Sequence, residues 1–204
     1  MAIHSKQKIK SVIQQFKYEY YGRVNLPYGL HSRGADRSAT INMVFPPSLE
    51  GRSVLDVGAY YGYTCFEAEA RGAARVQGIE LDPHRFRRAM LYKEAKDSEV
   101  EFLNMSAVEY QFVEPFDYLL FLNLLHHIRQ PFSLLERALP IVQERLVIEY
   151  PKKPIKRKRR VEMPIKRILE YCGKFFKETK TMASPCKSGG RPRILAIFSQ
   201  KNRV

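Results

Sequence analysis

The stretch LDVGAYYGY, residues 55–63, carries two glycines, Gly58 and Gly62, directly after a short apolar run. A strand that runs into a glycine-containing turn and then a helix places free backbone N–H groups beside a ligand. A dinucleotide would demand the spacing G-x-G-x-x-G, and this chain has Tyr60 where the middle glycine would stand. Asp56 would also set a negative charge near the two phosphates. The stretch therefore favours an amino-acid-like or sulfonium ligand over a dinucleotide.

An acidic residue, Glu80, stands at the end of the next apolar run. In this position a carboxylate can accept hydrogen bonds from both hydroxyls of a ribose. Leu81 follows and could pack on an adenine ring. The order of strand, D-x-G-x-x-x-G, helix, strand and acid indicates a site for a nucleoside-containing ligand. In the alternative interpretation, Gly58 and Gly62 serve only a tight turn.

Short apolar runs alternate with helix-like stretches along most of the chain, which is typical of a parallel sheet with crossover helices. The predicted strands span residues 52–59, 75–82, 100–106, 116–125 and 144–151, and the predicted helices span 63–73, 83–97, 129–142 and 165–176. Residues 6–21 and 38–45 are predicted to form helices before the sheet, and residues 176–200 a hairpin with its turn around Gly189 and Gly190. The predicted fold class is α/β: a Rossmann-like, doubly wound sheet of seven strands, mostly parallel, with a C-terminal antiparallel hairpin.

The charge of the chain is segregated. Residues 1–150 contain 18 Lys and Arg and 18 Asp and Glu, whereas residues 151–204 contain 17 and 3, so the last quarter carries the whole net charge of +14. Such asymmetry favours attachment to a polyanion, although a solvated face rich in lysine would look the same. The length of 204 residues predicts one domain, with a helical extension over 1–49, a ligand-binding core over 50–150, and a basic insertion plus hairpin over 151–204.

Several classes of protein are disfavoured by composition. No apolar run is long enough to span a membrane, and the first residues lack the apolar core of a signal peptide, so we expect a cytoplasmic protein. Three scattered cysteines, Cys65, Cys172 and Cys186, predict neither a disulfide framework nor a metal site. The sequence carries no signal for an oligomeric state.

Four segments together resemble the class I S-adenosylmethionine (SAM) dependent methyltransferases. VLDVGAYYG is similar to their first motif, VQGIELD to the second, VEFLNMSA to the segment after the third strand, and FDYLLFLNLLHHIRQP to the motif of the fourth strand. Within that superfamily, the combination is similar to the branch that contains methyl- and carboxymethyltransferases acting on the 5-oxygen of the tRNA wobble uridine. The resemblance covers about residues 50–150 and implies SAM as the cofactor.

The resemblance also implies roles for individual residues. Those implied to shape the site of the SAM methionine are Asp56, Gly58, Ala59, Tyr60, Gly62, Leu122 and Asn123. Glu80 would bind the ribose, Leu81 and Met105 would flank the adenine, and Ser106 would touch its edge. The chain departs from the commonest pattern in having Tyr60 in place of glycine and Ser106 in place of aspartate, which removes a charged acceptor for the adenine amino group.

Candidates for contact with the methyl acceptor lie in three places. His126 and His127 follow the fourth predicted strand, and we expect at most one of these adjacent rings to face the cleft, with His127 favoured as a base. The alternative is that both pack against the following helix. Arg33 and Arg37, in a glycine-containing segment before the sheet, could clamp a carboxylate, or could form surface salt bridges instead. Tyr61 is a further candidate.

Three functions remain open on the sequence alone. The first is methyl transfer to RNA, with residues 152–177 contacting phosphates and Tyr20, Tyr21 or Tyr28 stacking on bases, unless these rings pack on the core instead. The second is methyl transfer to a small metabolite. The third is a non-catalytic binding module that keeps the fold.

Overall fold

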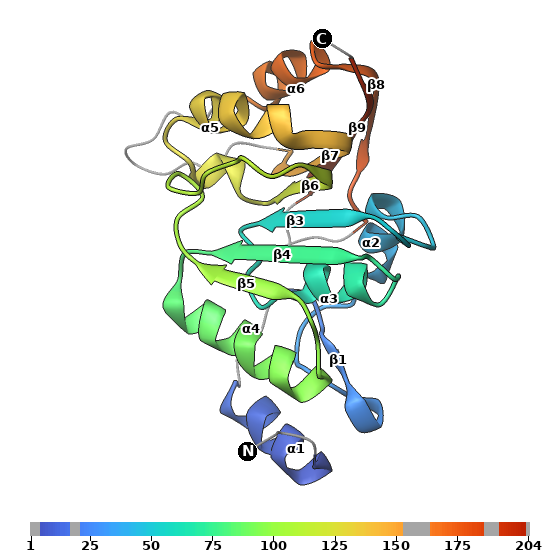
Figure 1. Ribbon diagram of the computed structural model, residues 1–204, viewed down its shortest axis with the longest axis vertical. Helices are drawn as coiled ribbons and strands as arrows, with labels where there is room; N and C mark the ends of the chain where they lie inside the picture. Colours follow the sequence, from blue (N-terminus) through green and yellow to red (C-terminus); the bar gives the residue numbers. More distant parts are fainter. Residues whose placement is uncertain (1–4, 17–20, 153–163, 186–191, 203–204) are drawn as a thin grey trace.

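A seven-stranded mixed sheet runs through the centre of the protein, as the computed structural model shows (Figure 1). The residues that the structure describes are 5–16, 21–152, 164–185 and 192–202. The strands of the sheet are β3 (Ser53–Val57), β4 (Arg75–Glu80), β5 (Glu101–Asn104), β6 (Phe116–Leu122), β7 (Val142–Pro151), β8 (Phe176–Ala183) and β9 (Arg193–Lys201). Their order is β5-β4-β3-β6-β7-β9-β8, parallel from β5 to β7, with β9 antiparallel to both neighbours. The predicted fold class is confirmed.

Helices cover both faces of this sheet (Figure 1). These helices are α2 (Ser38–Val44), α3 (Tyr63–Glu69), α4 (Pro83–Lys96), α5 (Pro131–Ala138) and α6 (Ile165–Gly173), and α1 (Lys6–Gln15) lies beyond α4 at the end of the molecule. Three short 3₁₀ turns, η1 (Pro27–Gly29), η2 (Leu125–His127) and η3 (Leu139–Ile141), and a two-stranded pair, β1 (Asn25–Leu26) with β2 (Leu30–His31), complete the described elements. Helix α4 begins where Asp82 Oδ1 accepts from the His84 and Arg85 N–H groups, with Pro83 at the first helical position.

Alternation along the central strands divides the core into two clusters. Val54 and Leu120 face the cluster that α1 to α4 cover, whereas Leu55 and Leu119 face the cluster that α5 and α6 cover. All four side chains are fully buried. Because successive strand residues point to opposite faces, a strand buried on both sides is apolar throughout. This is why β6 is apolar from Tyr118 to Leu122 and β3 is apolar at Val54, Leu55 and Val57.

Several element ends differ from the predicted ones. Strand β6 stops at Leu122 rather than at residue 125, because Asn123 has a φ of 60° and leaves the extended region. Helix α3 stops at Glu69, before Gly72 with its φ of 82°. The predicted helix 6–21 ends at Gln15, and residues 17–20 lie outside the described part of the chain. The predicted turn at Gly189 and Gly190 and the basic residues 153–163 also lie outside it.

The chain reverses its direction of travel across the sheet at β3. From β3 it passes outward to β4 and β5, and it then returns to the other side of β3 for β6 and β7. Open α/β sheets bind ligands beyond the carboxyl ends of the strands at such a point. The order of strands therefore places a candidate site where β3 and β6 end.

Candidate cofactor and acceptor site

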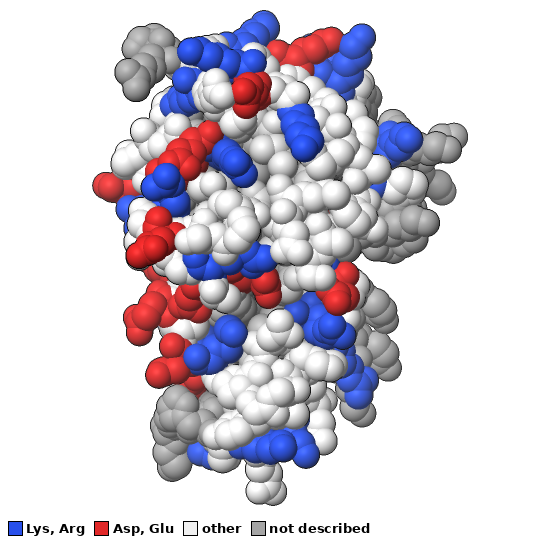
Figure 2. All heavy atoms as spheres, turned by 90° about the vertical axis from the view of Figure 1, so that its right-hand side faces the viewer, with Lys and Arg blue, Asp and Glu red and all other residues white. Residues whose placement is uncertain are grey.

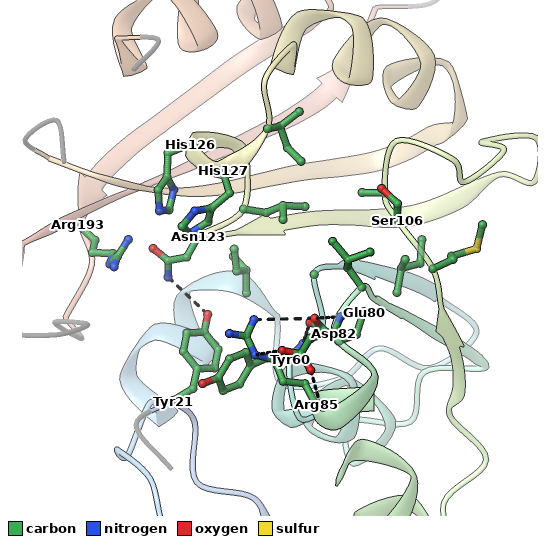
Figure 3. A pocket seen from close by; sticks show the side chains of 18 residues that line it. Tyr21, Tyr60, Glu80, Asp82, Arg85, Ser106, Asn123, His126, His127 and Arg193 are labelled. Carbon is green, nitrogen blue, oxygen red and sulfur yellow. Dashed lines mark hydrogen bonds and ion pairs between the residues drawn. The ribbon is translucent and has the colours of Figure 1, made fainter. Parts of the chain in front are cut away.

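A cleft of about 520 Å³ lies at the carboxyl ends of β3, β4, β5 and β6. The residues that line it are Tyr21, Gly58, Tyr60, Ile79, Glu80, Leu81, Asp82, Arg85, Met105, Ser106, Ala107, Leu122, Asn123, Leu124, His126, His127, Ile128 and Arg193. Figure 3 shows Glu80, Asp82 and Arg85 toward one end of the cleft, and His126 and Arg193 toward the other. The cleft thus has two chemically different ends.

Glu80 ends β4 with its carboxylate fixed by the backbone. Its Oε2 accepts from Tyr60 N–H at 2.8 Å, and its Oε1 accepts from Asp82 N–H at 2.9 Å. Arg85 Nη1 lies 3.9 Å from Oε1. Burial raises the pKa of Glu80 above its ordinary value, and the two N–H groups and Arg85 offset part of that effect. Each carboxylate oxygen keeps further lone pairs, so the group can still accept from ligand hydroxyls.

The segment after β3 holds its unusual backbone shape with two glycines and one tyrosine. Gly58, Tyr60 and Gly62 have φ angles of 86°, 56° and 81°. A Cβ on Gly58 would lie 3.2 Å from Leu124 Cδ1, whereas a Cβ on Gly62 would lie 2.5 Å from Phe102 Cζ. Gly62 therefore serves the packing of α3, and Gly58 serves the close approach of the loop to the η2 side of the cleft. Gly58 and Tyr60 line the cleft, and Gly62 does not.

Asp56, Ala59 and Tyr61 lie behind the cleft rather than on its lining. Asp56 is 2% exposed; Cys65 Sγ is 3.8 Å from its Oδ2, and its Oδ1 has no hydrogen-bond partner among the described residues. Burial raises the pKa of Asp56 to about 7, and the contact with Cys65 offsets part of that effect. The Tyr61 ring is buried under the Arg88 guanidinium, 4.2 Å from its centroid.

A buried polar network supports the floor of the cleft. Arg37 Nη2 donates to both carboxylate oxygens of Glu149 at 2.8 Å, and the side chains are 5% and 0% exposed. Asn123 Nδ2 also donates to Glu149, and it lies 3.5 Å from the Tyr21 hydroxyl (Figure 3). Ser184 Oγ donates to the same carboxylate at 2.6 Å. The buried Asn123 Oδ1 has no hydrogen-bond partner among the described residues.

Tyr21 joins this network to the glycine segment. Its ring lies 5.1 Å from the Tyr60 ring, and the Arg37 guanidinium lies 4.3 Å from its centroid. Burial is the main cause that raises the pKa of Tyr21 to about 12, so its hydroxyl is protonated at neutral pH. Tyr21 therefore presents a neutral hydroxyl and an aromatic edge to the cleft.

Both histidines of η2 line the cleft, so the expectation that at most one would face it is wrong. The 3₁₀ turn keeps the two rings on one side, with centroids 4.0 Å apart (Figure 3). His126 is buried against the Tyr150 ring at 5.4 Å, whereas His127 is exposed. This difference leaves His127 as the more accessible imidazole.

Leu81, Met105 and Ser106 line the other wall of the cleft. Asn104 Nδ2 donates to the Glu80 and Leu81 carbonyls at 2.8 and 3.1 Å and holds the ends of β4 and β5 together. Ser106 Oγ accepts from Val108 N–H at 3.2 Å within its own turn, and its hydroxyl proton is left to donate.

The predicted acceptor arginines take other positions. Arg37 faces Glu149 and does not line the cleft, and Arg33 lies on the exposed surface outside it. Sequence reasoning missed Arg85 and Arg193, which do line it. Arg85 stands three residues after the helix-capping Asp82, and this helical spacing turns its side chain back toward the end of the strand. No local sequence pattern distinguishes Arg193 from the other basic residues near the C-terminus.

Comparison with known proteins gives a family match over the core of the chain. Residues 54–144 match the family model described as a methyltransferase domain. No curated protein sequence matches the chain.

Solved structures share the fold at low sequence identity. The N-terminal domain of EvdMO1, crystallised in the presence of SAH and D-fucose, is 18% identical with a TM-score of 0.67, over 96% of this chain and 97% of that one. The chain spans 48% of the longer EvdMO1 structure. Magnesium protoporphyrin IX methyltransferase from Synechocystis PCC 6803, with bound SAM, is 17% identical with a TM-score of 0.63, over 80% and 77% of the two chains. The N-methyltransferase NodS from Bradyrhizobium japonicum WM9, in complex with SAH, is 14% identical with a TM-score of 0.65, over 78% and 85%.

The residues of the cleft fit SAM. A carboxylate fixed at the end of β4 suits a ribose, apolar Leu81 and Met105 suit an adenine, and the unpartnered Asn123 Oδ1 suits an ammonium donor. No phosphate-binding glycine pattern is present to suit a dinucleotide. The core of the chain, residues 54–144, thus matches a methyltransferase domain, and its cleft carries groups that suit S-adenosylmethionine as a cofactor.

Proposed function

We propose that this protein is a class I SAM-dependent methyltransferase and that it methylates an oxygen or nitrogen atom of an RNA, with tRNA as the first candidate. The observation that carries the proposal is where the basic part of the chain begins. Lys152 directly follows β7, and its N–H donates to the carbonyl of Pro192 at 3.0 Å, next to the cleft-lining Arg193. A polyanion that contacts Lys152 would therefore lie close to the cleft-lining Arg193.

Exposed cations also lie on α6, directly after it and at the start of β8. Lys166, Arg167, Lys174 and Lys177 are all exposed. In Figure 2 basic side chains gather toward the upper end of the molecule, where Figure 1 places α6 and β8, with acidic side chains among them. Lys and Arg that neutralise phosphates release counterions, which makes binding strongly dependent on salt.

The proposed chemistry needs alignment more than acid or base strength. SAM supplies a methyl group on a positively charged sulfur that leaves as a neutral thioether. Glu80 is proposed to hold the ribose, Leu81 and Met105 to flank the adenine, and Asn123 to face the methionine portion. The walls of the cleft would then place the acceptor lone pair behind the methyl carbon, and such positioning alone can supply an effective molarity on the order of 10⁵ M.

His127 is proposed to take the proton of the acceptor. It lines the cleft and is the exposed member of the histidine pair, so a nucleophile at the mouth can reach it. An imidazole accepts protons near neutral pH. As the new bond to the methyl carbon forms, the O–H or N–H proton of the acceptor would pass to His127.

The test is methyl transfer from labelled SAM to tRNA that lacks modifications, with binding measured at low and moderate salt. Lys166, Lys174 and Lys177 are changed together to Gln, and Lys6, Lys8 and Lys10 on α1 serve as the matched control, because α1 lies at the opposite end of the molecule (Figure 1). The first triple variant should bind tRNA more weakly. Its plot of log binding constant against log salt concentration should also be flatter, by roughly 0.7–0.9 in slope for each lost phosphate contact. The control should match the wild type. Absence of tRNA binding at low salt would contradict the proposal.

A small-molecule acceptor is the second candidate, and the names of two structural neighbours support it. EvdMO1 was crystallised with D-fucose, and magnesium protoporphyrin IX methyltransferase takes its name from a porphyrin. The N-terminal domain of EvdMO1 matches nearly the whole of this chain. If label from SAM enters the small-metabolite fraction of a cell extract and never the tRNA fraction, the acceptor belongs to this class.

A further inference from the structure

The charged groups that line the cleft fall into two sets. Glu80, Asp82 and Arg85 lie together, with Arg85 Nη1 3.9 Å from Glu80 Oε1 and Arg85 Nε 3.7 Å from Asp82 Oδ2. Arg193 lies apart from them, on the side of the cleft where His126 and Asn123 are placed (Figure 3). The proposed ribose end of the cleft therefore carries two carboxylates and one guanidinium, whereas the end beside the histidines carries the guanidinium of Arg193.

Arg193 is positioned by the sheet rather than by a loop. It is the first residue of β9 and pairs with Pro151 at the end of β7. On the other side, its carbonyl accepts from Ser184 N–H at 2.9 Å. The residue is 7% exposed, so its guanidinium is held inside the cleft wall instead of extending into solvent. A side chain on a rigid strand keeps its direction better than one on a loop.

Glu149, the carboxylate in the buried network below the cleft, already accepts hydrogen bonds from other side chains. Glu149 is fully buried, and its two oxygens accept from Arg37, Ser184 and Asn123. Among the residues known to line the cleft, the only carboxylates are Glu80 and Asp82, at the other end. The two lining carboxylates thus lie at the other end of the cleft from Arg193 and the two imidazoles.

We propose that Arg193, with His126 and His127 beside it, forms a subsite for an anionic group of the methyl acceptor. The proposal rests on the proposed methyl transfer and specifies its substrate: an acceptor that carries a carboxylate or phosphate close to its nucleophilic atom. A guanidinium presents a planar fork that matches either group through two parallel hydrogen bonds. Arg193 is then a specificity-determining residue, because it fixes one end of the acceptor while His127 faces the nucleophile.

The experiment measures anion binding without requiring methyl transfer. SAH-loaded protein is titrated with inorganic phosphate in one arm and acetate in the other, and the imidazole signals of His126 and His127 are followed by NMR. We expect saturable shifts in the wild type with at least one of the two anions, and a loss of affinity of about tenfold or more in Arg193→Gln. Arg193→Lys, which keeps the charge and loses the fork, should fall between them.

Arg129→Gln is the matched control, because Arg129 lies two residues beyond His127 on the exposed surface and does not line this cleft. It should bind the anions as the wild type does. Unchanged SAM affinity in Arg193→Gln shows that the variant is folded with its cofactor site intact; if it does not fold, Arg193→Lys provides the comparison. A preference for phosphate or for acetate shows whether the anionic group of the acceptor is a phosphate or a carboxylate. Wild-type signals that do not respond to either anion, or an Arg193→Gln variant that binds as the wild type does, would overturn the subsite even if methyl transfer is observed.

Discussion

Glu80 is the residue on which recognition of the cofactor depends most directly. Glu80→Ala removes both carboxylate oxygens that Tyr60 and Asp82 N–H groups hold in place, and with them two acceptors for the ribose. Hydrogen bonds to charged groups are worth about 1.5–3 kcal/mol each, so SAM affinity should fall by at least about tenfold in calorimetry. Glu109→Ala, on the exposed turn after β5 and outside the cleft, is the control. Equal affinities for the two variants would remove the ribose role of Glu80.

Substitution of His127 tests the reaction rather than the binding of SAM. His127→Ala removes the exposed imidazole of η2, and general-base catalysis contributes typically ~10²–10⁴-fold, so turnover should fall within that range. SAM affinity should stay within about twofold of the wild type, because His127 is expected to face the acceptor. The rate of methyl transfer and the calorimetric affinity are measured on the same preparation. A large loss of SAM affinity with unchanged turnover would refute the assignment.

Asp56 should make stability depend on pH. In the folded protein its pKa is about 7, whereas in the unfolded chain an aspartate loses its proton near pH 3.9. Between about pH 4 and pH 7 folding requires proton uptake. The stability of the wild type relative to Asp56→Asn should therefore fall, by up to about 1.4 kcal/mol for each unit by which the pH rises. Denaturant unfolding at several pH values measures this difference.

The exposed Asp36 supplies a comparison of opposite sign. The Ser38 N–H group is the main cause that lowers the pKa of Asp36, so its contribution is lost as pH falls through the acidic range. The unfolding of Asp36→Asn should therefore differ from that of the wild type mainly above that range. A difference between wild type and Asp56→Asn that does not vary with pH would contradict the raised pKa of Asp56.

At the scale of elements, Gly62 couples the start of α3 to β5. A Cβ at this position would lie 2.5 Å from Phe102 Cζ and 2.9 Å from Phe66 Cε2, and the φ of 81° is itself unfavourable for alanine. Gly72 has nearly the same φ, 82°, but its nearest atoms lie 3.9 Å away. Gly62→Ala should thus destabilise the protein by about 1–3 kcal/mol more than Gly72→Ala, since overpacking adds to backbone strain. Equal midpoints in urea would show that the Phe102 contact does not constrain α3.

The elements and the cofactor wall were predictable because their signals are local. Strand β6 is apolar without interruption from Tyr118 to Leu122, β3 and β4 carry shorter apolar stretches, and the residues that follow these strands arrive at the same edge of the sheet by topology alone. Positions that depend on long-range packing were not predictable. The pairing of Arg37 with Glu149 joins residues 112 apart in sequence, and Arg193 reaches the cleft only because β9 lies beside β7. The end of β6 was missed because the positive φ of Asn123 has no glycine to mark it.

At the scale of the whole molecule, one buried network joins three distant parts of the chain. Arg37 precedes α2, Glu149 lies in β7 and Ser184 follows β8, and Thr40 Oγ1 lies 3.3 Å from Ser184 Oγ. The N-terminal extension is thereby bound to the strands that carry the C-terminal hairpin. Tyr21, which lines the cleft, lies under the same Arg37 guanidinium, so the network also fixes one wall of the site.

This arrangement predicts a non-additive response to mutation. Arg37→Met alone leaves the fully buried Glu149 carboxylate without its cation, and breaking such a buried pair costs about 3–5 kcal/mol. Adding Glu149→Gln to Arg37→Met removes the uncompensated charge while keeping an amide for Ser184 and Asn123, so the double variant should regain part of the lost free energy of unfolding. A double-mutant cycle by denaturant unfolding measures the coupling. If the two single losses simply add, the ion pair does not hold the N-terminal extension to β7, and the wall formed by Tyr21 must be supported by its stacking on Tyr60 instead.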